Sequence, residues 1–235
     1  DLKKAFDTVD HRILLKKLEY YGIRGTVNKW FESYLTDRSQ FTQYQNVKSS
    51  EQIISCGVPQ GSVLGPLLFL IYVNDVSKAV TNGKTMLFAD DTNVFVHSKN
   101  LPELYEMLKD NVSKLKTWFH HNKLSLSLEK TQYSIFHKKN IVIPCQYDKI
   151  KFDNYTIDRV VSVKYLGLII DDTFTFEEHC NSLKSSLVKY GSSFKIIKRF
   201  IPESCKITLY YAYVYSKIQY GIEVYGNCNK GLLKG

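Results

Sequence analysis

A tetrapeptide with two neighbouring carboxylates, Phe-Ala-Asp-Asp at residues 88–91, places the strongest constraint on the fold. Short runs typical of strands flank it, residues 85–87 before it and residues 93–96 after it, so we expect a tight β-hairpin. Because an ionised carboxylate without a partner is costly to bury, Asp90 and Asp91 must face water or a cation. Mg²⁺ commonly binds one or two carboxylates together with substrate phosphates. The hairpin tip is therefore a candidate metal site, although ordinary turns also contain Asp-Asp.

Length and charge narrow the class of protein. The chain has 235 residues, enough for one large domain or two smaller ones with a buried core. With 44% hydrophobic and 23% charged residues, disorder is not expected. Lys and Arg outnumber Asp and Glu by 32 to 23, and the resulting net charge of +9 favours a polyanionic partner.

Cysteine spacing and the longest apolar run argue against two further classes. The five cysteines are scattered and form no Cys-x-x-Cys pair, which indicates reduced thiols in an intracellular protein rather than a disulfide framework or a structural zinc site. The apolar run of residues 63–73 is interrupted by Gly65 and Pro66 and is shorter than the about 20 residues of a membrane span. We therefore expect a buried helix there and no membrane partner.

Hydrophobic periodicity predicts a mixture of helices and strands. Apolar residues at helical spacing predict a helix between Asp10 and Gly22 and further helices over residues 27–35, 63–80, 101–119, 175–200 and 202–221. Short alternating or apolar runs predict a hairpin of residues 41–45 with 51–55, and strands over residues 132–136, 141–143, 150–152 and 160–170. Strands dominate before residue 170 and helices after it, so the expected class is α+β followed by a mainly helical segment.

Two details of the C-terminal helices are also predicted. Thr175 and Glu178 have the spacing of a capping box at the start of a helix. The last helix carries more aromatic rings than one buried face holds, so we expect most of them in the core and the others on a surface that stacks on nucleic acid. These rings are Tyr210, Tyr211, Tyr213, Tyr215 and Tyr220.

Two other stretches combine with the hairpin into a family pattern. Residues 1–11 read DLKKAFDTVDH, and residues 57–66 read GVPQGSVLGP. In this order and spacing, the three stretches resemble motifs A, B and C of reverse transcriptases, most closely those of non-LTR (LINE-type) retrotransposons. The resemblance implies a polymerase palm over residues 1–170, an antiparallel sheet packed on helices with part of the fingers and the primer grip. It also implies an incomplete, helical thumb-like segment over residues 171–235.

The resemblance assigns a metal site and a sugar-selecting residue. By analogy with the family, Asp1, Asp90 and Asp91 hold two Mg²⁺ ions, with Mn²⁺ as an alternative, for phosphoryl transfer to a primer 3′-hydroxyl. Phe6 stands five residues after Asp1, where the family places a ring that excludes a 2′-hydroxyl and so selects deoxynucleotides. A phenylalanine of the hydrophobic core is the alternative.

Further residues match the family by position. Gln60 would contact the nascent base pair, and Gly61 would let the template backbone approach closely, although a turn that leads into a helix has the same composition. Residues 122–130 resemble the next motif, whose lysine, here Lys130, would protonate the leaving pyrophosphate; a solvated lysine is the alternative. Residues 164–167 resemble the primer-grip hairpin, which assigns that role to Tyr165, Leu166 and Gly167.

The implied function is that of an RNA-directed DNA polymerase, a nucleotidyltransferase of a retrotransposon. It would add dNTPs to a DNA primer on an RNA template, in the cytoplasm and nucleus. A truncated or decayed copy that binds nucleic acid without polymerising is one alternative. A viral RNA-templated RNA polymerase is another, against which Phe6 and residues 59–61 argue. Because the sequence begins on Asp1, we expect an internal piece that lacks the upstream fingers and is inactive alone. The oligomeric state is not indicated.

Overall fold

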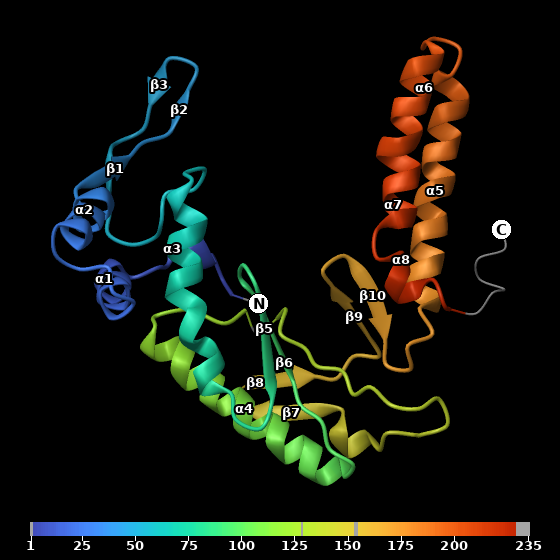
Figure 1. The fold of residues 1–235 in the computed structure, drawn as a ribbon, viewed down its shortest axis with the longest axis horizontal. Coiled ribbons are helices and arrows are strands. Elements are labelled where there is room, and N and C mark those ends of the chain that lie inside the picture. The colour runs from blue at the N-terminus through green and yellow to red at the C-terminus, as the bar shows by residue number, and fades with distance from the viewer. Residues whose placement is uncertain (1, 128, 153–154, 229–235) are drawn as a thin grey trace. The chain divides into compact units, whose positions relative to one another are not determined.

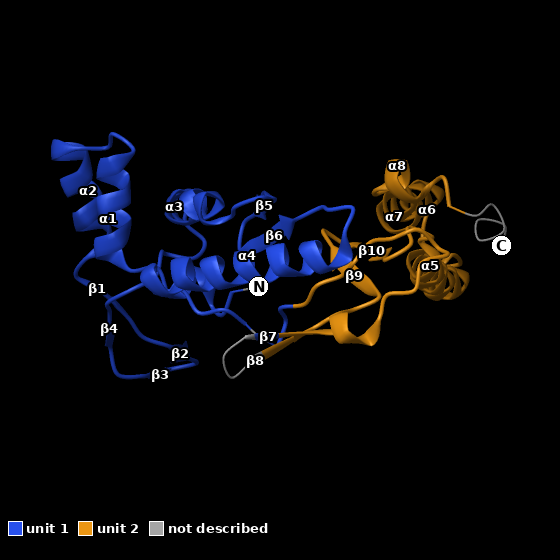
Figure 2. Cartoon of the chain, turned by 90° about the horizontal axis from the view of Figure 1, so that it is seen from below, with its two compact units in different colours: residues 1–131, 151–155 blue, residues 132–150, 156–235 orange. Residues whose placement is uncertain are grey.

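The chain folds into two compact units, which we describe separately. The computed structural model describes residues 2–127, 129–152 and 155–228. One unit consists of residues 1–131 and 151–155, and the other of residues 132–150 and 156–235 (Figure 2). This division follows compactness, so it does not test the predicted boundary between a palm and a thumb-like segment after residue 170, which stays a prediction.

Helices and short strands alternate along the chain (Figure 1). The α-helices are α1 (His11–Tyr20), α2 (Gly25–Leu35), α3 (Leu64–Val73), α4 (Leu101–His121), α5 (Glu177–Ile197), α6 (Glu203–Tyr210), α7 (Ser216–Gln219) and α8 (Ile222–Tyr225). Three short 3-10 helices are η1 (Ala5–Asp7), η2 (Asn74–Ala79) and η3 (Cys145–Tyr147), and a π-helical segment, η4 (Tyr211–Tyr215), joins α6 to α7. None of the described helices is both long and apolar enough to cross a membrane.

The strands of the described residues form separate two-stranded sheets. The strands are β1 (Arg38–Gln40), β2 (Gln43–Tyr44), β3 (Val47–Lys48), β4 (Gln52–Ile54), β5 (Lys84–Phe88), β6 (Asp91–Phe95), β7 (Lys149–Phe152), β8 (Tyr155–Asp158), β9 (Ser162–Tyr165) and β10 (Leu168–Asp171). Their pairs are β1 with β4, β2 with β3, β5 with β6, β7 with β8 and β9 with β10. The mixture of helices and antiparallel pairs agrees with the predicted α+β class.

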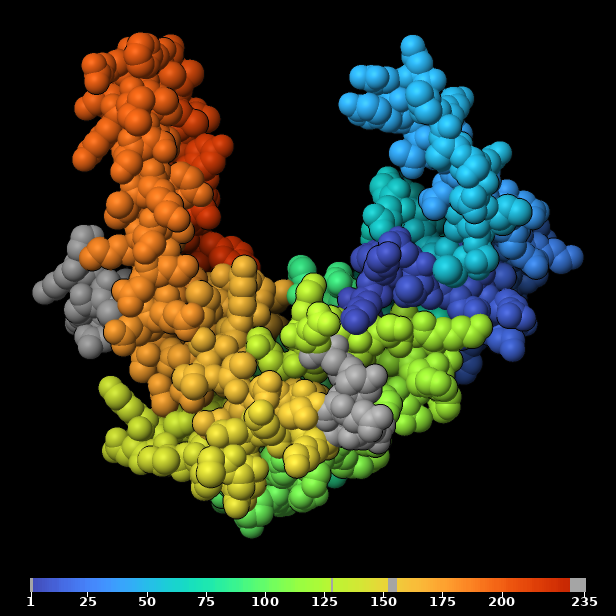
Figure 3. Space-filling view, turned by 180° about the vertical axis from the view of Figure 1, so that it is seen from behind, coloured from blue at the N-terminus to red at the C-terminus, as the bar shows by residue number. Residues whose placement is uncertain are grey.

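The first unit has its core between α1, α2, α3 and the end of α4. Buried side chains from all four helices meet there, among them Leu14, Leu35, Phe69 and Phe119. The predicted buried helix is present as α3 and buries Leu68, Phe69 and Tyr72, but its other face exposes Leu67 and Leu70. The β2–β3 end of the segment from β1 to β4 projects beyond the helices of its own unit (Figure 3), and the residues of this segment are almost all exposed.

The second unit has a smaller core beneath α5 and α8. Leu168, Phe176, Cys180 and Tyr225 are buried together there. Helix α5 contacts β10 and lies alongside the segment from α6 to α7 (Figure 1). All five tyrosines of the last predicted helix are between 42 and 56% exposed. The expectation that most of them are core residues is therefore wrong.

Three local predictions in the second unit are also wrong. Residues 132–136 form no strand, and Tyr133 makes only an isolated bridge to Arg159. Residues 141–143 form no strand either, since the 87% exposed Val142 has no neighbouring strand to pair with among the described residues. Residues 160–170 do not form the single predicted strand but the hairpin that the resemblance of residues 164–167 implied, β9 and β10, because the chain reverses at Leu166 and Gly167 with φ of 44° and 88°.

Candidate active site

The hairpin predicted around the two carboxylates is present. Strand β5 pairs antiparallel with β6, and Phe88 lies opposite Asp91 at the end of the ladder. The turn therefore consists of Ala89 and Asp90 alone. Ala89 has a φ of 51°, which lies in the left-handed region that costs a residue with a Cβ roughly 1–2 kcal/mol. The register places Asp90 in the turn and Asp91 as the first residue of β6.

Both carboxylates fit a cation. Asp90 and Asp91 are half-buried, and no hydrogen bond or ion pair joins either side chain to another residue that the structure describes. Partly buried negative charges without a partner favour a bound cation, and carboxylate oxygens are ligands that Mg²⁺ prefers. Within the described residues no third histidine, cysteine or acidic side chain completes a metal cluster. Asp1 lies outside the described residues, so its predicted convergence with Asp90 stays a prediction.

Motifs A and B are locked together through their backbones. The Val58 N–H donates to the Phe6 carbonyl and the Gly57 N–H to the Val9 carbonyl, both at 2.8 Å. Gly57 has a φ of 90°, and a Cβ added there would lie 2.9 Å from the carbonyl oxygen of Asp7. Real Cβ atoms do not approach a backbone so closely, so only glycine allows these two segments to touch without a shift.

Side chains add two further links between these motifs. The Gln60 Nε2 donates to Asp7 Oδ1 at 2.7 Å, and the buried His11 places its Nε2 2.7 Å from the Gly57 carbonyl oxygen. The hydrogen bond to Asp7 holds the Gln60 amide in one orientation. Because Gln60 is exposed, the amide stays open to a ligand. Sequence reasoning did not assign Asp7 or His11 any role. Because 53 and 46 residues separate the partners, no local pattern could have identified them.

Phe6 and Gly61 lie on the two sides of this junction. The half-buried ring of Phe6 stacks on the buried ring of Phe69 in α3, with centroids 4.5 Å apart and planes at 30°. The ring thus contacts the core, as the alternative for Phe6 requires, and its role in sugar selection stays a prediction. Gly61 has a φ of 79°, and a Cβ added there would meet no atom within 4 Å. Its surroundings leave room for a ligand.

The segment with Lys130 is attached to the start of the chain. Leu2 forms an antiparallel bridge with Leu126, and the Lys123 ammonium lies 2.5 Å from a carboxylate oxygen of Asp10. Partial burial alone would raise the pKa of Asp10, but hydrogen bonds from Lys123 and from the Ile13 backbone outweigh it and lower that pKa below its ordinary value. The side chain of Lys130 itself is exposed, and its predicted part in proton transfer is untested.

The predicted primer grip is the turn of the β9–β10 hairpin in the second unit. The Tyr220 hydroxyl donates to the Leu166 carbonyl. A Cβ added at Gly167 would lie 3.2 Å from the ring of Tyr220. Packing against that ring and the φ of 88° therefore favour glycine at this position, whatever the turn binds. The roles assigned to Tyr165, Leu166 and Gly167 stay predictions.

Comparison with known proteins places the chain in a family. Residues 1–170 match the family described as "Reverse transcriptase (RNA-dependent DNA polymerase)". The probable RNA-directed DNA polymerase from transposon X-element of Drosophila melanogaster is 27% identical over 239 residues, which cover 96% of this chain and 25% of that protein. The RNA-directed DNA polymerase from mobile element jockey of the same species is 26% identical over 243 residues, covering 99% and 26%.

A third relative is the probable RNA-directed DNA polymerase from transposon BS of Drosophila melanogaster, 29% identical over 195 residues that cover 76% of this chain and 20% of that protein. The chain thus spans about a quarter of the length of the relatives it matches. The relatives confirm the resemblance to non-LTR elements. Because the family match covers more than half of its residues, the chain belongs to the reverse transcriptase family.

Proposed function

We propose that the chain takes part in RNA-directed DNA synthesis for a non-LTR retrotransposon, extending a DNA primer on an RNA template with dNTPs. The unpaired carboxylates Asp90 and Asp91 on the strained β5–β6 turn carry this proposal. A family of RNA-dependent DNA polymerases needs carboxylates at the reacting phosphates, and this turn presents two of them without a competing partner among the described residues.

The side chains of the first unit have separable parts in the proposed reaction. Asp90 and Asp91, with Asp1, would hold Mg²⁺ or Mn²⁺. Two such ions, when bound, activate the primer hydroxyl and neutralise charge on the triphosphate. Phe6 would exclude a ribose 2′-hydroxyl, because its ring, held against the core by Phe69, cannot easily move aside.

Gln60 and Lys130 would act on the nucleotide at two other points. The Nε2 of Gln60 is bound to Asp7, so its carbonyl oxygen remains available to a base pair. The open space at Gly61 would admit the template backbone. Lys130 is exposed and would donate a proton to the leaving pyrophosphate.

The finer architecture belongs to the same proposal. Residues 1–170 would form the palm with part of the fingers, and the β9–β10 turn would hold the primer. Residues 171–235 would begin the thumb, and the exposed tyrosines between Tyr210 and Tyr220 give that segment rings suited to stack on nucleic acid. Synthesis would begin on RNA in the cytoplasm or nucleus.

Primer extension tests this function. The chain is extended upstream by its native residues and given an RNA template, a DNA primer, dNTPs and Mg²⁺. We expect extension by the parent protein, none by Asp90→Asn, and unchanged extension by Asp37→Asn, a control at an exposed aspartate in the bend between α2 and β1. Template–primer binding is measured alongside by fluorescence anisotropy and should survive Asp90→Asn. Extension by the Asp90→Asn protein would refute the assignment.

A further inference from the structure

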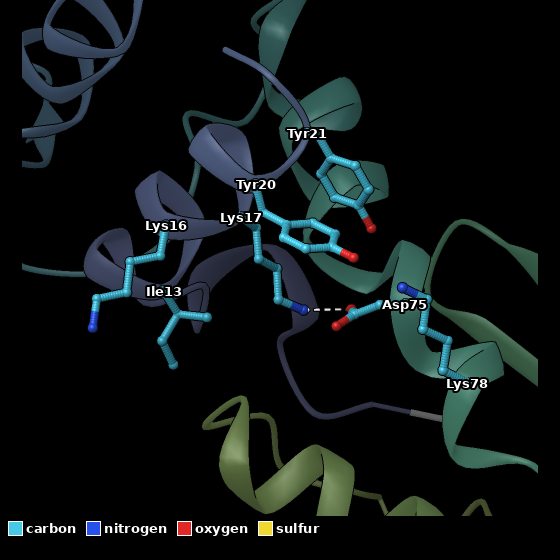
Figure 4. Close-up of a pocket in the computed structure, with 7 residues that line it drawn as sticks. All are labelled: Ile13, Lys16, Lys17, Tyr20, Tyr21, Asp75 and Lys78. Carbon is cyan, nitrogen blue, oxygen red and sulfur yellow. Dashed lines mark hydrogen bonds and ion pairs between the residues drawn. The ribbon is translucent and has the colours of Figure 1, made fainter. Parts of the chain in front are cut away.

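A pocket between α1 and η2 lies outside the residues assigned to synthesis. Its volume is about 270 Å³, slightly below the about 300–1,000 Å³ of sites for drug-sized ligands. It is lined by Ile13, Lys16, Lys17, Tyr20, Tyr21, Asp75 and Lys78 (Figure 4). Three lysines and two tyrosines in so small a space restrict the class of ligand that it suits.

The interior of the pocket is electrically balanced. The Lys17 ammonium lies 2.5 Å from a carboxylate oxygen of Asp75 and 2.6 Å from the Tyr72 carbonyl oxygen. It also lies over the rings of Tyr72 and Trp118, at 5.0 and 4.7 Å from their centroids. The Lys17 side chain is only 13% exposed. Lys17 and Asp75 therefore satisfy each other, and neither needs a ligand.

The edge of the pocket carries charge that is not balanced. Lys78 extends from η2 toward Tyr20, with its ammonium 5.4 Å from the ring centroid, while Lys16 extends outward beside Ile13 (Figure 4). No ion pair links Lys16 or Lys78 to a carboxylate in the part of the chain that the structure describes. Two exposed ammonium groups on opposite sides of the pocket favour an anionic strand that passes between them (Figure 4).

Aromatic surface lies between these two lysines (Figure 4). Tyr20 is 71% exposed even though Lys78 covers part of its ring, and Tyr21 is 38% exposed. The two rings meet edge to face with centroids 5.5 Å apart. The Tyr21 hydroxyl accepts a hydrogen bond from Asn74, which fixes its position. Exposed rings beside cations are the combination that binds single-stranded nucleic acid, since bases stack on the rings and phosphates pair with the cations.

We propose that this pocket binds one nucleotide of a single-stranded nucleic acid, with its base on Tyr20 and its flanking phosphates on Lys16 and Lys78. The pocket is too small for several nucleotides, so the remaining strand would pass over the surface of α1. Such a site would hold a strand independently of Asp90, Asp91 and the incoming nucleotide. The proposal therefore does not depend on the proposed polymerase activity.

The first test measures binding of labelled single strands by anisotropy, with a chelator and without primer or dNTPs. Across a salt series, Lys16→Gln/Lys78→Gln should reduce the magnitude of the slope of log K against log salt by about 1.4, since each phosphate contact to a single strand contributes about 0.7. Lys29→Gln/Lys99→Gln, a control at two other exposed lysines, should change it by much less. RNA and DNA strands of equal length are compared to show whether a 2′-hydroxyl contributes.

Two matched tyrosine-to-alanine variants test the aromatic contact. Tyr20→Ala should weaken binding about fivefold or more, the lower bound for loss of one stacked base. Tyr44→Ala, which removes a 75% exposed tyrosine from β2, should weaken it less.

Photo-crosslinking locates the strand. A 4-thiouracil strand should crosslink to Tyr20 or Tyr21, and trypsin, which cleaves after Lys17 and Arg24, releases both tyrosines in the peptide of residues 18–24. Crosslinks only to other peptides would overturn the proposal, as would a salt slope that the Lys16/Lys78 and Lys29/Lys99 variants reduce equally. Displacement of the strand by anionic vesicles but not by unlabelled strand would also overturn it, in favour of a lipid surface.

Discussion

Replacement of Gly57 by alanine tests whether motifs A and B form one rigid unit. The new Cβ would lie 2.9 Å from the Asp7 carbonyl oxygen and 3.0 Å from the Asp7 Cα. Both neighbours are backbone atoms that cannot rotate away. Relief of the contact would require separation of the two segments, which would weaken the hydrogen bonds from Gly57 to Val9 and from Val58 to Phe6.

Two costs make up the expected loss of stability. A φ of 90° costs alanine roughly 1–2 kcal/mol, and insertion of a methyl group into a packed contact costs about 1–3 kcal/mol. We therefore expect Gly57→Ala to lower the free energy of unfolding of the first unit by about 2–5 kcal/mol. Gly61→Ala is the matched control, because its φ of 79° carries the first cost while its open surroundings remove the second.

Urea unfolding followed by tryptophan fluorescence measures this difference. The two tryptophans of the chain, Trp30 and Trp118, both belong to the first unit, so their signal reports that unit alone. With about 1–3 kcal/mol separating the variants and a dependence of about 2 kcal/mol per M urea, the midpoint of Gly57→Ala should lie about 0.5–1.5 M below that of Gly61→Ala. Equal midpoints would show that the junction yields to the methyl group and would refute the rigid-unit argument.

Three further predictions concern other sites. Asp171→Asn should destabilise the second unit by about 1.5–3 kcal/mol, since it weakens charged hydrogen bonds from the backbone N–H groups of Thr175 and Phe176, just before α5. These bonds outweigh burial and lower the pKa of Asp171 below 3.8, so the stability that Asp171 contributes is full above pH 4 and is lost as pH falls through the lowered pKa. Circular dichroism across this pH range should show the loss for the parent protein and not for the asparagine variant. Cys180 and Cys228 should react slowly with a thiol reagent at pH 8, since both are buried and burial raises the pKa of Cys180 to about 11. The exposed thiols of Cys56, Cys145 and Cys205 should react fast. In the upstream-extended protein, Phe6→Val should raise the ratio of kcat/KM for a ribonucleotide to that for a deoxynucleotide by at least about tenfold; an unchanged ratio would assign Phe6 to the core alone.

Periodicity correctly predicted helices of the first unit that pack on its core. Helices α1, α2 and α4 were predicted because their apolar residues recur on one side, and each contributes to the first core. The hairpin around Asp90 was predicted from its flanking strand-like runs. Residues 141–143 show the limit of this reasoning, because an apolar run becomes a strand only where a partner strand lies beside it. Val142 is 87% exposed, and nothing in the sequence around it indicates this exposure.

The start of α5 shows how a distant side chain replaces a local signal. The predicted capping box of Thr175 and Glu178 does not form, because the N-cap residue is Phe176, with a φ of 56°, and the Thr175 hydroxyl accepts only a long, 3.5 Å hydrogen bond from the Glu177 N–H. Instead Asp171, the last residue of β10, accepts hydrogen bonds from the backbone N–H groups of Thr175 and Phe176. Asp171 thus fixes the turn that leads into the helix from several residues away, and the spacing rule for caps could not identify it.

Family resemblance identified the residues expected to touch substrate but not those that hold them in place. Gln60 was assigned by its position in a motif, whereas its partner Asp7 was not assigned at all. Their hydrogen bond exists because two segments separated by about 50 residues meet at Gly57. Contacts of this kind depend on tertiary structure, and no pattern within either segment encodes them.

At the turn that carries Asp90, the backbone conformation that the hairpin requires conflicts with the conformational preference of alanine. Two-residue hairpin turns need a positive φ at their first residue, which favours glycine or asparagine, yet this turn has Ala89 with a φ of 51°. Five residue pairs from Lys84↔Phe95 to Phe88↔Asp91 fix the register, so the turn can neither slip nor gain a residue to relieve the strain. The same register fixes two neighbouring carboxylates at the hairpin end. Strain of this kind persists where the surrounding structure enforces it, and it is concentrated at functional sites. The unfavourable Ala89 backbone and the half-buried, unpaired Asp90 and Asp91 therefore both support the proposed cation site at this turn.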